Sequence, residues 1–119
     1  MPASPRDGAY LWDIVAAGRE IEGFLRGKKY SDFQSTKLLR LGIEREIEII
    51  GEAARRVSAE FQAEHPEIPW AQIVGQRNVI AHEYGDLKVE RLWSVATEYV
   101  PKLVTLLEPL IPPPPEEVR

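Results

Sequence analysis

The sequence predicts an all-α protein, an antiparallel bundle of four helices with room for a fifth. Three observations lead to this fold class. Apolar residues recur at spacings of three and four in four separate segments, which is the periodicity of one helix face. No segment shows the alternation of apolar and polar residues that is typical of a strand. Short polar breaks with glycine or proline separate the segments, as expected between antiparallel neighbours.

The first half of the chain contains two long helical patterns and a short one. We expect the first helix between Asp7 and Gly27, because the glycine offers a C-terminal stop. Ser31–Gln34 resembles a capping box and predicts a short helical turn. The longest pattern predicts one helix from Ser35 to Glu64. Its apolar face consists of Leu39, Ile43, Ile47, Ile50, Ala54, Val57 and Phe61.

The second half contains two more helical patterns. We expect the third helix from Pro69 to His82, since proline is favoured in the first turn of a helix. Asp86 is a good N-cap for the fourth helix, whose apolar residues continue to Leu110. Pro101 lies inside this pattern and should kink or split the helix.

The composition fits one ordinary globular domain. The chain has 119 residues, of which 44% are hydrophobic and 29% charged. We expect residues 1–111 to form a single helical domain and the proline-rich residues 112–119 to be a disordered tail. Cysteine is absent, which excludes disulfides and thiolate chemistry. No apolar run is long enough for a membrane span, so we expect a cytoplasmic location.

The charge balance limits how the chain can engage nucleic acid. Its net charge is −4 and its pI is about 5.2. A protein that coats nucleic acid is normally basic, and this composition argues against that class. An enzyme that acts on nucleic acid through a small local site stays compatible with it, because a few basic residues at a cleft suffice.

One segment near a helix end gathers unusual chemistry. Arg77–Gly85, "RNVIAHEYG", combines a fixed cation, an amide, an imidazole and a phenol. Helical spacing places Asn78 near His82, whereas Arg77 lies about 140° around the axis from the histidine. Arg77 and His82 can act on one ligand only at the flank of a helix or where its end unwinds. Together they suit cleavage of an RNA phosphodiester without a metal, with His82 as the base and Arg77 holding the phosphate.

The chain has few histidines for such chemistry. It contains two, and His65 lies in the "EHP" break far from the segment. Two distant histidines without cysteine make a poor transition-metal site, so we expect no metal. A reaction that needs both an acid and a base would require a second imidazole. A symmetric dimer with two copies of His82 around one cleft would supply it.

Structural interpretations of the same residues stay open. Arg77 could pair with a glutamate of the long helix, such as Glu48 or Glu52. A histidine near a helix end often partners the helix dipole, as His82 would. Tyr84 could be an ordinary packing residue whose hydroxyl faces water.

The order and spacing of several sequence blocks resemble a known family. These blocks are "DIVAAGREIEGFL", "IEIIGEAARRVS", "HPEIPWAQIVGQRNVIAHEYG" and "LWSVATEYVPKL". The chain resembles the HepT-like toxins of the HEPN (higher eukaryotes and prokaryotes nucleotide-binding) superfamily. The ribonuclease signature of that superfamily reads here from Arg77 through Asn78 to His82, and the HepT form adds Tyr84.

The resemblance implies a homodimeric, HEPN-like, all-α ribonuclease with a composite cleft that cleaves RNA without a metal. Arg77 and His82 would be catalytic and Asn78 would support them. It further implies a toxin–antitoxin pair with a minimal nucleotidyltransferase (MNT) antitoxin that transfers AMP to Tyr84. The magnesium and ATP would belong to that partner, so this chain would carry no cofactor.

Two other functions are compatible with the same sequence. The first is a non-catalytic HEPN dimer that binds and positions a nucleotidyltransferase partner, or that holds a nucleotide. The second is a purely structural helical dimer. Loss of cleavage after changes at Arg77 or His82 would separate the ribonuclease from both.

Overall fold

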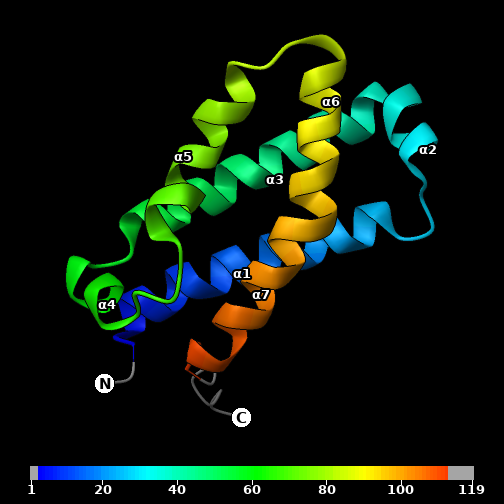
Figure 1. The fold of residues 1–119 in the computed structure, drawn as a ribbon. Helices are drawn as coiled ribbons and strands as arrows, with labels where there is room; N and C mark the ends of the chain where they lie inside the picture. The colour runs from blue at the N-terminus through cyan, green and yellow to red at the C-terminus, as the bar shows by residue number, and fades with distance from the viewer. Residues whose placement is uncertain (1–2, 113–119) are drawn as a thin grey trace.

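The computed structural model describes residues 3–112, which form helices and connecting turns without a strand (Figure 1). This confirms the predicted all-α class. The long elements are α1 (Pro5–Leu25), α3 (Lys37–Arg56), α5 (Trp70–Ala81) and a column made of α6 (Gly85–Ser94), the π-helical turn Val95–Tyr99 and α7 (Val100–Leu107). The short elements are α2 (Tyr30–Ser35), α4 (Ala59–Glu64) and the 3-10 turn Glu108–Leu110. Within the described range, no helix has the length and hydropathy that crossing a bilayer requires.

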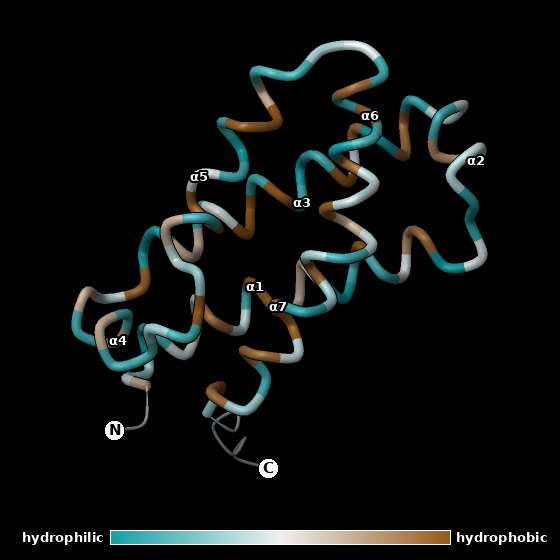
Figure 2. The backbone as a smooth tube through the Cα atoms, viewed as in Figure 1, coloured by the Kyte–Doolittle hydropathy of each residue, from teal (hydrophilic) through white to brown (hydrophobic). Residues whose placement is uncertain are grey.

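Helix α3 is the central element of the bundle. It packs antiparallel to α1 and also contacts α2, α5 and α6. The α6–α7 column runs back across both α3 and α1 (Figure 1). Hydrophobic residues recur at intervals along each long helix (Figure 2). Each fully buried Leu or Ile contributes about 1.5–3 kcal/mol. The largest fully buried side chains are Phe33, Leu11, Ile14, Ile21, Ile43, Ile68, Ile80, Leu92, Leu107 and Val15.

The single long helix predicted from Ser35 to Glu64 is wrong, because the chain breaks between α3 and α4. The buried carboxylate of Asp7 on α1 accepts hydrogen bonds from the Ser58 N–H at 2.8 Å and the Ser58 hydroxyl at 2.6 Å. The Ser58 hydroxyl in turn accepts from the N–H of Phe61 at 3.2 Å and so caps α4. Apolar periodicity continues through this break, which is why the sequence pattern did not reveal it.

The α6–α7 column is interrupted close to Pro101, as predicted. A π-helical turn, in which the Val100 N–H bonds to the Val95 carbonyl, ends at Tyr99, two residues before Pro101. This confirms that the helix splits at the proline, which cannot donate a backbone hydrogen bond. The predicted cap at Asp86 is wrong. Helix α6 begins at Gly85, whose φ of 59° favours glycine, and Asp86 lies in the first turn, where the helix dipole favours its charge.

The predicted tail lies almost wholly outside the described residues. Residues 113–119 are not described. Pro112, the first residue of that segment, packs on α1, where its Cγ lies 2.8 Å from the position of a Cβ built on Gly8.

Helices α1 and α7 approach closely at Gly18. A Cβ added there would lie 2.5 Å from Cγ2 of Val104 and 3.2 Å from Cγ1 of Val100. Both valines are branched and packed in the bundle, so neither side chain can yield without a backbone shift. The absence of a side chain at Gly18 therefore sets the distance between these helices.

We expect Gly18→Ala to lower the free energy of unfolding by about 1–3 kcal/mol, because the added methyl overlaps Val104. Chemical denaturation checks this. Gly23→Ala is the matched control, since nothing lies within 4 Å of a Cβ there. That change should raise stability by up to about 1 kcal/mol through helix propensity. Val104→Ala should partly rescue Gly18→Ala, and equal effects of the two glycine changes would contradict the close-approach argument.

A buried carboxyl group lies between α1 and α3. Glu46 is 8% exposed, and its Oε2 has no hydrogen-bond partner in the described structure. Burial raises the pKa of Glu46 to about 7, the neighbouring carboxyl of Glu20 acts in the same direction, and Arg45 opposes them. The folded protein therefore holds a proton at Glu46 that the unfolded chain releases at lower pH.

Because the folded-state pKa of Glu46 is raised, its contribution to stability is complete below the unfolded pKa of about 4.5. It is lost as the pH rises through about 7. Glu46→Gln should leave stability nearly unchanged at pH 5 and raise it at pH 8 by on the order of 2 kcal/mol. Denaturation series at both pH values measure this. Glu22→Gln, at an exposed position of α1, should change neither value, and the same pH dependence in Glu46→Gln as in the unchanged protein would sink the prediction.

Candidate functional site

The four residues of the sequence motif lie at one end of α5 and in the turn that follows it. Arg77 and Asn78 belong to the last turns of α5, His82 is its C-cap, and Tyr84 precedes α6. All four are exposed, and Tyr84 reaches 79% exposure. Ile80 between them is buried and fixes this end of α5 in the core. In Figure 1 the turn lies at the free upper end of the α5–α6 pair.

Backbone geometry explains why the helix ends at His82. Its backbone has φ −92° and ψ 0°, and its N–H still bonds to the Asn78 carbonyl at 3.2 Å. The next N–H, of Glu83, bonds to the Ile80 carbonyl at 3.1 Å, which tightens the last turn. The chain then extends at Tyr84 and enters α6 at Gly85. The imidazole is therefore carried at the point where the helix unwinds, as the spacing of Arg77 and His82 required.

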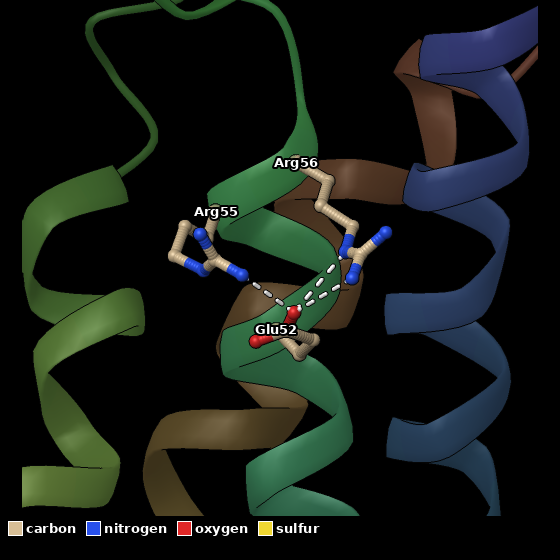
Figure 3. A network of polar contacts seen from close by, with 3 residues as sticks. All are labelled: Glu52, Arg55 and Arg56. Carbon is tan, nitrogen blue, oxygen red and sulfur yellow. Dashed lines mark hydrogen bonds and ion pairs between the residues drawn. The ribbon is translucent and has the colours of Figure 1, made fainter.

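Arg77 contacts α3. Its Nε lies 3.7 Å from Oε2 of Glu48, whose other oxygen lies 3.7 Å from Arg45. Glu48 is thus the glutamate that Arg77 meets. Glu52 instead accepts from Arg55 at 2.7 Å and from Arg56 at 3.1 Å (Figure 3).

The contact of Arg77 with Glu48 is weak. The Arg77 side chain is 61% exposed, and 3.7 Å is beyond hydrogen-bond distance. An exposed pair of this kind contributes at most about 1 kcal/mol. A phosphate that forms two charge-assisted hydrogen bonds to the guanidinium would compete with it readily.

The two histidines have different surroundings. Within residues 3–112, neither the imidazole of His82 nor the phenol of Tyr84 forms a hydrogen bond or ion pair. His65, by contrast, has its Nδ1 3.0 Å from Glu67, and its ring packs on Phe61 at 4.5 Å between centroids. His65 is thus fixed by contacts with neighbouring residues, whereas the ring of His82 is exposed to solvent.

A strong ion pair, which the sequence analysis missed, lies beside the motif. Oε1 of Glu83 accepts hydrogen bonds from Nε of Arg91 at 2.9 Å and from Nη2 at 2.6 Å. Glu83 is the middle residue of the turn, and Arg91 lies two turns into α6. Their separation of eight residues gives no local signal, since one partner lies outside the helix that carries the other. A further pair, Lys88 with Glu44 at 3.1 Å, ties α6 to α3.

A groove lies between α5 and the α6–α7 column. Its volume is about 440 Å³, and Tyr99 lies in it with a buried hydroxyl that has no partner in the described structure. Its lining consists of Pro69, Gln72, Gln76, Arg91, Ser94, Val95, Glu98, Tyr99, Lys102, Leu103 and Leu106. The four motif residues are not part of this lining. Among residues 3–112, no three His, Asp or Glu side chains gather where they could hold a metal ion.

The site therefore offers an exposed cation, an exposed amide, a solvent-facing imidazole and an exposed phenol at one helix end. This set can bind an anionic phosphate and can give or take a proton near neutral pH. The phenol oxygen of Tyr84 is a nucleophile, and the exposure of this side chain lets an electrophile reach it.

Comparison with known proteins agrees with the sequence resemblance. A family model described as "Ribonuclease HepT-like" matches residues 14–110. "Probable ribonuclease HepT" of Thermococcus cleftensis is 37% identical over 101 residues, which cover 85% of this chain and 92% of that protein. "Putative RNase MJ1380" of Methanocaldococcus jannaschii is 35% identical over 95 residues, which cover 80% and 87%. No solved structure matches significantly.

The family model covers most of the chain, including the central helix α3, the motif at the end of α5 and the α6–α7 column. Both relatives are aligned over most of their own length, so the match is to a whole protein and not to a shared motif. This chain therefore belongs to the HepT-like ribonuclease family.

Proposed function

We propose that the protein is a ribonuclease toxin of a toxin–antitoxin pair that acts in the cytoplasm. The observation that carries this proposal is the exposure of Arg77, Asn78, His82 and Tyr84 together at the end of α5. Family membership supports it, as do relatives whose names describe ribonucleases.

The proposed reaction needs no metal. His82 removes the proton from an RNA 2′-hydroxyl, and the 2′-oxygen attacks phosphorus while the bond to the 5′-oxygen breaks. Arg77 stabilises the charge that develops on the phosphate oxygens, and Asn78 adds a neutral donor. The leaving 5′-oxygen takes a proton from a second imidazole. The products are a 2′,3′-cyclic phosphate and a 5′-hydroxyl end.

We propose a twofold dimer as the source of the second imidazole, because each motif contains one histidine. Apolar side chains are exposed on the three helices around the motif, which suits an interface there. These are Leu41 on α3, Val79 on α5 and Leu87 on α6, which are 51%, 45% and 65% exposed. Their burial between two copies would bring both turns to one cleft.

Tyr84 is the proposed acceptor for AMP, transferred by an MNT-type nucleotidyltransferase partner. Its phenol oxygen would attack the α-phosphate of ATP, with release of pyrophosphate. The 79% exposure of Tyr84 supports this, since the partner must enclose the phenol. The added phosphate would place negative charge beside Arg77 and repel the RNA backbone. Magnesium and ATP would be supplied with the partner.

A non-catalytic module is the second candidate. The contact between Arg77 and Glu48 and the net charge of −4 favour it, because both reduce attraction for RNA. Such a module would bind the nucleotidyltransferase or a nucleotide and cleave nothing. It predicts complex formation that survives changes at Arg77 and His82.

We expect Arg77→Ala and His82→Ala each to lower the rate of RNA cleavage by about 10²–10⁴-fold, because one removes the phosphate clamp and the other the base. Cleavage of a labelled RNA, with detection of the cyclic phosphate end, measures this. Arg55→Ala is the control, an exposed arginine that pairs with Glu52 away from the motif.

Cleavage by the unchanged protein should persist in a chelator, and the variants should keep the dimer in sedimentation analysis. Unfolding free energies should stay within about 1 kcal/mol, since Arg77 and His82 are exposed. Absence of cleavage by the unchanged protein, with retained partner binding, would favour the non-catalytic module.

For the modification, incubation with the nucleotidyltransferase, ATP and magnesium should add AMP to the intact mass. Tyr84→Phe should abolish the addition, because it removes the only nucleophilic atom of that side chain. Tyr10→Phe, at a half-buried position of α1, should not. An undiminished mass shift in Tyr84→Phe would assign the acceptor elsewhere.

A further inference from the structure

The turn between α5 and α6 has an inward middle residue and two outward neighbours. The Glu83 side chain is 18% exposed, whereas His82 and Tyr84 on either side of it are exposed. A turn of three residues that carries two solvent-facing functional groups needs an anchor, because exposed backbone alone gives little resistance to motion.

Backbone hydrogen bonds hold only the first part of this turn. The N–H groups of His82 and Glu83 bond back to α5, at 3.2 and 3.1 Å. Tyr84, the N-cap of α6, makes no side-chain capping bond, and Gly85 follows with φ 59°. Beyond Glu83 the conformation of the turn therefore depends on side-chain contacts.

The contact of Glu83 with Arg91 is the tightest ion pair near the motif. Two guanidinium N–H groups converge on one carboxylate oxygen at 2.6 and 2.9 Å. By comparison, Arg77 lies 3.7 Å from Glu48. Charge-assisted hydrogen bonds with two donors add directional constraint as well as energy. The Glu83 side chain is 18% exposed, which reduces the competition of water for this oxygen.

We propose that Glu83 and Arg91 form a clamp that positions His82 and Tyr84, so that Glu83 is a positioning residue of the ribonuclease site. The clamp fixes the centre of the turn to a rigid turn of α6. Its role in catalysis rests on the proposed function, whereas its control of the turn does not. Glu98 is the one carboxylate among the residues that line the groove with Arg91. It accepts a hydrogen bond from the Ser94 hydroxyl at 3.1 Å.

The two-histidine composition gives a direct readout of the clamp. In an NMR spectrum of the imidazole C–H groups, His82 and His65 give the protein's only ring signals of this type. In Glu83→Gln, which weakens the clamp but keeps the size of the side chain, the His82 signal should shift and broaden. The His65 signal should stay unchanged as an internal reference, because its partner is Glu67.

Glu52→Gln is the matched control. It removes a carboxylate that also receives two arginines, at 2.7 and 3.1 Å, but lies away from the turn (Figure 3). This variant should move neither histidine signal. Thermal unfolding of each variant confirms that the spectra report folded protein.

The activity arm separates positioning from general stability. In Glu83→Gln, kcat for RNA cleavage should fall tenfold to a hundredfold, because misplacement of a catalytic group raises the barrier. Kd for an RNA with a 2′-deoxy group at the cleavage position should change less than twofold. Arg91→Lys keeps the charge but loses the paired donors. Its kcat should lie between that of the unchanged protein and that of Glu83→Gln. The swap Glu83→Arg with Arg91→Glu should recover part of the loss.

The outcomes are distinguishable. An unchanged His82 signal in Glu83→Gln overturns the clamp. A changed signal with unchanged kcat overturns its positioning role in cleavage. If the unchanged protein cleaves no RNA, the proposed function fails, and the NMR arm still decides whether the clamp holds the turn. A changed signal with lowered kcat and unchanged Kd supports the inference.

Discussion

The central position of α3 is the constraint on which the rest of the structure depends. This helix contacts α1, α2, α5 and α6, so its buried stripe is the common core of the bundle. That stripe includes Ile43, Ile47 and Ile50. Adjacent positions on the same helix, Glu44 and Glu48, carry carboxylates to the edges where α6 and α5 pack. One helix thus supplies both the apolar core and the acidic partners of Arg77 and Lys88.

This arrangement gives the motif a rigid base and a free surface. Ile80 is buried against the core, and Glu83 is tied to Arg91, so the end of α5 is anchored on two sides. His82 and Tyr84 stay in solvent between these anchors. A side chain that must meet a large polymer, or be enclosed by a partner protein, has to be exposed, yet its backbone must be fixed for the chemistry to be efficient.

Pairing of charges also explains how an acidic chain can present a local cation. Arg77, Lys88 and Arg91 each meet a glutamate, but the contacts differ in strength. The exposed 3.7 Å contact of Arg77 leaves its guanidinium open to a competing phosphate, whereas the shorter bonds of Arg91 keep that side chain in a structural role. Net charge is a property of the whole chain and says little about a single exposed guanidinium.

The sequence pattern was sufficient to predict the elements that residues close together in the chain determine. Periodicity located the four long helices, and Pro101 located the interruption of the last one, because proline acts through its own backbone. The pattern failed at Ser58 and Asp86. At Ser58 the helix ends because Asp7, distant in sequence, accepts both its N–H and its hydroxyl proton. At Asp86 the left-handed glycine before it already begins the helix.

For the candidate site, the sequence by itself determined the residue types, their order and the family, since motif chemistry is written along one short segment. It also placed His82 near a helix end. Only the tertiary structure decided that Ile80 is buried while its neighbours face solvent. It also decided that Arg77 contacts Glu48 rather than Glu52, and that Glu83 pairs with Arg91. The physical reason is that these contacts join separate helices. Their geometry depends on how the helices pack, and no spacing within one segment encodes that.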